Sequence, residues 1–172
     1  MILLSIALLQ AAAAGGGDPL APARSDQVQC YGPDATRREC VSIGAYHRSP
    51  DGGVLNEAIV LITPDPRIIM TTVAPVQVKD GAICGAMQPA HLAASTFTVA
   101  DAPATPEQTA ALRQELAKAM QPLFGKEICT SITTTPDGAS IGQARVDGVR
   151  QPAMDQPVIW VPKAAGWKIR TN

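Results

Sequence analysis

"AIVLITPDPRIIMTTVAPVQVKDGAICG" (residues 58–85) alternates apolar runs with short groups of turn residues, which is the pattern of consecutive β-hairpins. Within it, Val76 to Lys79 alternates apolar and polar residues, as a half-exposed strand does. The run "AIVLI" (58–62) is continuously apolar, so we expect its strand to be covered on both faces. Pro75 cannot donate a hydrogen bond to a neighbouring strand, which predicts a sheet edge or a bulge at that position.

The same pattern continues on both sides of this stretch. Asp-Gly dipeptides at 51–52, 80–81, 137–138 and 147–148 separate the apolar runs, and this pair tolerates the positive φ angles of tight hairpin turns. The strands predicted on this basis are residues 40–48, 54–63, 67–78, 82–88, 127–135, 139–146, 157–161 and 166–171.

One segment, "TPEQTAALRQELAKAMQPLFG" (105–125), has helical periodicity. Thr105 is a suitable N-cap, Pro106 fits the first helical position, and Gln108 completes the spacing of a capping box. We expect one amphipathic helix over about 106–121, packed on the sheet. Hairpins with one segregated helix predict an α+β fold, mainly antiparallel hairpins arranged as a meander.

Composition excludes one class of partner. The chain has 172 residues, a formal net charge of -1, 17% charged residues and 3% aromatic residues. Nucleic-acid binding needs clustered cations for the phosphates and, for single strands, aromatic side chains on which bases stack. The sequence therefore predicts no nucleic-acid partner.

The N-terminus predicts export. "MILLSIALLQAAAA" (1–14) has a short apolar core followed by small residues, the layout of a secretory signal peptide, although no Lys or Arg precedes the core. That apolar run is too short to span a bilayer, so we expect no transmembrane segment after cleavage. Residues 15–27 are rich in Gly, Pro and Ala and predict a flexible linker. Residues 28–172 then form one domain, and the protein is expected to be periplasmic or secreted.

Four cysteines in an exported chain predict two disulfides, for which three connectivities are possible. The segments "CVSIGAYHRSPDG" (40–52) and "CTSITTTPDG" (129–138) share C-x-S-I followed by P-D-G, so their cysteines occupy matching places before a turn. This similarity favours the pairs Cys30–Cys40 and Cys84–Cys129. The spacings of zinc clamps and of C-x-x-C redox pairs are missing, and no metal site is predicted.

Three residues are candidates for binding. Arg37 and Arg38 lie between Cys30 and Cys40, where a closed loop would present them to a carboxylate, a phosphate or a partner protein. A hairpin through "PDGG" (50–53) would place His47 opposite Asn56, with Arg48 and Glu57 nearby.

These observations favour a small exported protein of the periplasm or envelope that acts as a non-catalytic binding or interaction module. Its partner would be an unknown protein or small ligand in the envelope, and no cofactor or catalytic residue is predicted. One alternative is a small periplasmic hydrolase or isomerase that uses His47 with nearby acids. Another is a structural envelope component, with the Pro- and Gly-rich linker as a spacer.

Overall fold

The predicted hairpins are the building units of the protein, described here over residues 17–171 in a computed structural model. At two of the Asp-Gly turns both residues have positive φ, 50° and 75° at Asp80 and Gly81, and 47° and 80° at Asp147 and Gly148. These are the angles that a two-residue turn needs to match the twist of its flanking strands. The turn residues therefore act as the sequence predicts.

Thirteen strands and two α-helices follow one another along residues 17–171. The strands are β1 (Gln27–Tyr31), β2 (Glu39–Cys40), β3 (Ser42–Arg48), β4 (Val54–Pro64), β5 (Arg67–Lys79), β6 (Ala82–Gly85), β7 (Thr96–Val99), β8 (Ala102–Pro103), β9 (Ile128–Thr134), β10 (Ser140–Val146), β11 (Val149–Arg150), β12 (Gln156–Pro162) and β13 (Lys168–Ile169). The helices are α1 (Pro89–Ala94) and α2 (Pro106–Met120). Short 3-10 helices are η1 (Pro22–Ser25), η2 (Gln121–Leu123), η3 (Pro152–Met154) and η4 (Lys163–Ala165).

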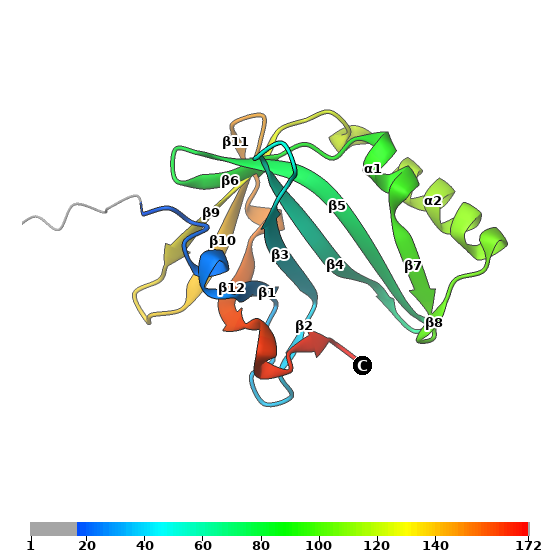
Figure 1. Cartoon of the computed structure of the whole chain (residues 1–172), viewed down its shortest axis with the longest axis horizontal. Coiled ribbons are helices and arrows are strands. Elements are labelled where there is room, and N and C mark those ends of the chain that lie inside the picture. Colours follow the sequence, from blue (N-terminus) through cyan, green and yellow to red (C-terminus); the bar gives the residue numbers. More distant parts are fainter. Residues whose placement is uncertain (1–16, 172) are drawn as a thin grey trace, which may run out of the picture.

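Eight strands close into an antiparallel barrel (Figure 1). Following the pairings in the order β4, β3, β1, β12, β10, β9, β6 and β5 returns to β4. The prediction of an α+β fold built on an open meander is therefore wrong. The reason is β1, which the sequence patterns did not reveal: it pairs with β3 on one side and with β12, from the far end of the chain, on the other.

The sheet divides at the long strand β5. Residues 68–71 of β5 pair with β7 and residues 76–79 pair with β6, while β4 pairs with residues 67–76 on the other side of β5. Residues 72–75 therefore pair with neither β6 nor β7. Pro75 lies in this interval, which suits a residue that cannot donate a ladder hydrogen bond.

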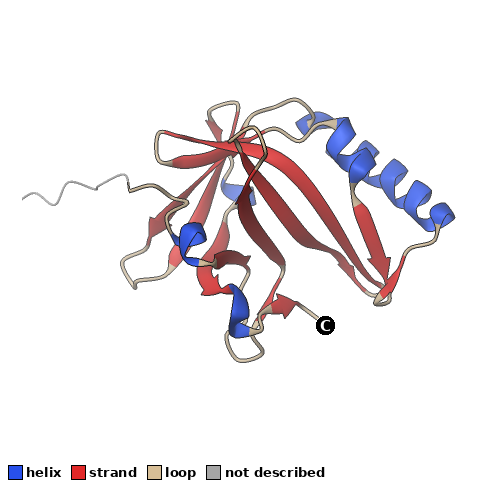
Figure 2. Cartoon of the chain, in the orientation of Figure 1, coloured by secondary structure: helices blue, strands red, loops and turns tan. Residues whose placement is uncertain are grey.

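Helices α1 and α2 pack beside the β7 branch (Figure 2). Met70 of β5, Leu92 of α1 and Phe97 of β7 form a buried cluster, which Leu112 and Leu116 of α2 cover. The helix predicted at 106–121 is thus present as α2, followed directly by the 3-10 turn η2. Met70 lies on the same face of β5 as Thr72 and Ala74, because alternate residues of a strand share a face.

The capping box of α2 is complete. Thr105 Oγ1 accepts a hydrogen bond from the Gln108 backbone N–H at 3.2 Å, and Gln108 Oε1 accepts one from the Thr105 backbone N–H at 2.9 Å.

Replacing Thr105 by Ala should therefore lower the free energy of unfolding by about 1 kcal/mol, while Thr105→Ser should lower it by only a few tenths of a kcal/mol. Urea denaturation followed by circular dichroism measures both variants. Equal losses in the two variants would contradict the capping role.

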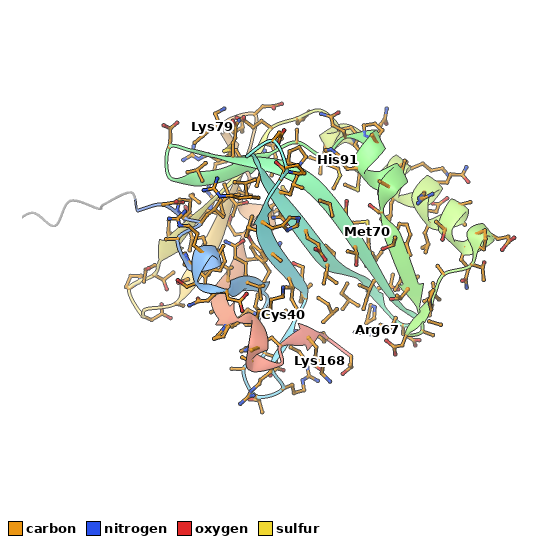
Figure 3. All side chains as sticks on the ribbon, in the orientation of Figure 1. Cys40, Arg67, Met70, Lys79, His91 and Lys168 are labelled. Carbon is orange, nitrogen blue, oxygen red and sulfur yellow. A yellow bond between two sulfur atoms is a disulfide. The ribbon has the colours of Figure 1, made fainter. Side chains whose placement is uncertain are left out.

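A second core lies outside the barrel, over β1, β3 and β12. Val28, Cys30, Cys40 and Val161 are its buried members, and the disulfide Cys30–Cys40 joins two fully buried side chains. The parallel pair of β2 with β13 seals this core, with Cys40 aligned to Ile169. In Figure 3, the labels Cys40 and Lys168 mark these two strands. The other disulfide, Cys84–Cys129, joins directly opposed residues of β6 and β9.

The two disulfides are those that the repeated C-x-S-I motif favours, and both cysteines of that motif come just before or within the first strand of a hairpin. Two disulfides are compatible with an exported or extracellular protein. No helix within residues 17–171 has the length and apolar character to cross a membrane.

The described N-terminal part begins within the segment predicted to be a linker. There Leu20 is buried and η1 lies against β1. The predicted signal peptide, residues 1–14, falls outside the described residues.

Candidate functional site

The interior of the barrel is unusually polar where β1, β3, β4 and β5 meet. Gln29 pairs with Gly44, Tyr46 pairs with Asn56, and Thr72 pairs with Ala58. Because the residues in each pair lie side by side on one face, this register gathers Gln29, Tyr46, Asn56 and Thr72 inside the barrel. Gln29 has no exposed surface and Thr72 is 5% exposed.

Two tyrosines form hydrogen bonds within this cluster. The hydroxyls of Tyr31 and Tyr46 both donate to Gln29 Oε1, at 2.9 Å and 2.5 Å. Burial raises the pKa of Tyr31 to about 12. Burial also raises the pKa of Tyr46, and the neighbouring Tyr31 raises it further. Both hydroxyls therefore stay protonated at physiological pH and remain hydrogen-bond donors.

Gly44 marks the point on which these groups converge. A Cβ atom added at Gly44 would lie 3.7 Å from each of Gln29 Oε1, Tyr46 Oη and Asn56 Nδ2. A glycine inside a strand often marks a site that another group approaches closely. The missing side chain leaves room for the polar groups around it.

Three buried polar atoms of the cluster have no hydrogen-bond partner: Gln29 Nε2, Asn56 Oδ1 and Thr72 Oγ1. Leaving such an atom unsatisfied costs about 1–3 kcal/mol, so natural proteins keep few of them. The three atoms offer an N–H donor, a carbonyl acceptor and a hydroxyl that can serve as either. Of the three, Asn56 and Thr72 line a cavity and can bond a ligand with complementary hydrogen-bonding groups.

Asn56 and Thr72 line a cavity of about 210 Å³, which we call the barrel cavity. It lies at the division of β5 and reaches the surface at the exposed Pro75. Its apolar walls come from several strands and the loop after β6: Ala58, Ala74, Val76, Ile83, Met87 and Ile128. All the described residues that line it are uncharged.

A further glycine shapes the rim of this cavity. A Cβ atom at Gly85 would lie 3.0 Å from the carbonyl oxygen of Pro75 and 3.0 Å from Val76 Cγ1. A side chain at Gly85 would therefore push β6 away from β5. The close approach of the two strands at this point depends on glycine.

Comparison with family models, curated proteins and solved structures found no match.

His47 lies outside this cluster. It pairs with Leu55, whereas Tyr46 pairs with Asn56, so the predicted pairing of His47 with Asn56 is wrong by one residue. A shift of one residue moves every side chain of a strand to the opposite face. Asn56 consequently points into the barrel, while His47 is exposed.

Arg37 and Arg38 both contact other residues of the protein. Arg37 Nε lies 2.9 Å from Asp34 Oδ2 and 3.3 Å from Glu39 Oε2, and Arg38 donates to the Ala165 carbonyl at 3.3 Å. A strand length of about 16 Å separates His47 from Ser42, where this loop rejoins the barrel. The three predicted binding residues are therefore not brought together.

Glu39, the last residue before Cys40 in that loop, is almost completely buried. It accepts a hydrogen bond from the Thr171 hydroxyl at 2.7 Å, and this bond, with the nearby Arg37, lowers the pKa of Glu39. Glu39 thus attaches the C-terminal segment to the disulfide loop, which is a structural role.

One group resembles a metal site by composition. Ligand atoms of Cys84, Glu127 and Cys129 lie within 4.8 Å of one another. The two sulfurs are bonded to each other, and both Glu127 oxygens accept hydrogen bonds from Lys79 Nζ, at 2.9 Å and 2.7 Å. In this disulfide form the group offers no free set of metal ligands.

Proposed function

We propose that the protein is a non-catalytic binding module that holds one small, mainly apolar ligand in the barrel cavity. The observation that carries this proposal is a pair of unpartnered buried atoms, Asn56 Oδ1 and Thr72 Oγ1, whose residues line the barrel cavity. An eight-stranded barrel is just wide enough to be filled by side chains or to hold one small ligand. Small polar and glycine residues leave this one partly unfilled.

The size and chemistry of the cavity restrict the ligand. A volume of about 210 Å³ is below the range of about 300–1,000 Å³ that is usual for drug-sized ligands. The walls are mainly apolar and carry no charge, so the buried part of the ligand is a mainly apolar body without charge. A hydroxyl or carbonyl on that body would meet Asn56 and Thr72.

We further propose that this binding takes place in the periplasm or outside the cell. The two disulfides support that location, because such bonds persist in oxidising compartments. The ligand would then be a small molecule of the envelope or the surrounding medium.

Binding of 4-ethylphenol, compared with ethylbenzene, tests the proposal. The two probes differ only in a hydroxyl, and titration followed by two-dimensional amide NMR detects weak binding of both. We expect the phenol to bind more tightly because its hydroxyl meets Asn56 and Thr72. Thr72→Val, which removes one hydroxyl while keeping the shape, should weaken phenol binding by about three- to tenfold.

Stability provides the control for this variant. Thr72 Oγ1 is buried and unpartnered in the free protein, so Thr72→Val should not lower the free energy of unfolding and should raise it by up to about 1 kcal/mol. Thr71→Val, on the opposite face of the same strand, is the matched control and should leave the binding of both probes unchanged.

Ala58→Leu should fill the cavity and weaken the binding of both probes. Equal binding of phenol by the wild type, Thr72→Val and Ala58→Leu would refute the proposed site.

A further inference from the structure

A second cavity, which we call the end cavity, lies at one end of the same barrel. Its volume is about 200 Å³. Leu20, Ala23 and Arg24 from the N-terminal segment cover it, and its other walls are Tyr46, His47, Arg48 and Val54. The covering segment includes the 3-10 turn η1, blue in Figure 1, which contacts β1 and β3.

The end cavity and the barrel cavity are neighbours. Tyr46 lines both cavities and is therefore a wall that they share. Val54 of the end cavity is also the cross-strand partner of Val76, which lines the barrel cavity. A ligand that passes along the Tyr46 ring and these two valines would occupy both cavities.

The two cavities differ in charge. Arg24 in the wall of the end cavity forms an ion pair with Asp18 at 2.6 Å, so its charge is compensated. Arg48 has no ion-pair partner among residues 17–171, and it lines the cavity together with the apolar residues Leu20, Ala23 and Val54. An uncompensated arginine beside apolar walls suits a carboxylate that is attached to an apolar body.

We propose that the ligand is a small amphipathic monocarboxylate, with its carboxylate at Arg48 in the end cavity and its apolar body in the barrel cavity. This inference rests on the proposed function and adds the class of ligand to it. Arg48 is two residues along β3 from Tyr46, the partner of Asn56, which corresponds to about 7 Å. One aromatic ring with a short side chain is long enough to join the carboxylate position to the hydroxyl position at Asn56.

Binding of 3-(4-hydroxyphenyl)propanoate, compared with 4-ethylphenol, tests this inference. The two probes share the phenol and differ chiefly in the carboxylate. We expect the wild type to bind the propanoate about tenfold more tightly, and this preference should decrease as salt is added. Arg48→Gln should reduce the preference to less than about twofold and leave 4-ethylphenol binding unchanged. Arg145→Gln removes the same charge from an exposed site on β10 and should keep the preference.

The results with the two probes distinguish a failure of the monocarboxylate inference from a failure of the proposed function. A wild type without preference, or an Arg48→Gln variant that keeps it, overturns the inference and leaves the proposed function standing. Propanoate binding that Ala58→Leu does not affect also overturns it, because the ligand would then occupy the end cavity alone. If the wild type binds neither probe, the proposed function fails and the inference fails with it.

Discussion

A variant with both Cys30 and Cys40 replaced by Ala should lose about 2–5 kcal/mol of its free energy of unfolding. Two effects add in this variant. The disulfide restricts the unfolded chain, and its two fully buried cysteines pack with Val28 and Val161 in the core outside the barrel. Urea denaturation of the oxidised protein and of the double variant, followed by tryptophan fluorescence, measures the difference.

The control for this prediction lies in the same loop. Thr36 is exposed between the two cysteines, and Thr36→Ala should change stability by less than about 0.5 kcal/mol. A double cysteine variant that loses less than about 1 kcal/mol would contradict the prediction. It would mean that the parallel pair of β2 and β13 holds the loop without the disulfide.

The second large effect is expected at Phe97. This side chain is 5% exposed and packs with Met70, Leu92 and the apolar stripe of α2. Phe97→Ala should lower the free energy of unfolding by about 3–5 kcal/mol, because it removes apolar burial and leaves a cavity between the helices and the β7 branch. Urea denaturation followed by circular dichroism measures it.

Two further variants show whether the effect comes from packing. Phe97→Leu keeps most of the apolar volume and should lose less than about 1.5 kcal/mol. Glu115→Ala, at an exposed position of α2, should change stability by less than about 0.5 kcal/mol. If Phe97→Ala loses no more than Phe97→Leu, the cluster is not packed as the structure has it.

Local features of the fold were predictable because neighbouring residues determine them. The turn at Asp80 and Gly81 needs only two residues that tolerate positive φ. The start of α2 needs only Thr105, Pro106 and Gln108, whose contacts are all within one turn. The disulfide pairing followed from a similarity between two hairpin segments.

The candidate site was not predictable in the same way. Polar residues such as Asn56 and Thr72 look like the solvent-facing half of an alternating strand. A slip of one residue in the predicted β3–β4 hairpin assigned Asn56 to the exposed face with His47. The one available indication was Gly44 inside a predicted strand, since glycine there often marks a close approach.

By itself, the sequence determined where the hairpins turn and where the helix begins, and it favoured the cysteine pairing that the structure shows. Only the tertiary structure decided that the sheet closes into a barrel and that Gln29, Asn56 and Thr72 face its interior. Closure depends on β1 pairing with β12, across almost the whole length of the chain. Such a contact is set by the packing of all the intervening strands, so no local pattern of residues specifies it.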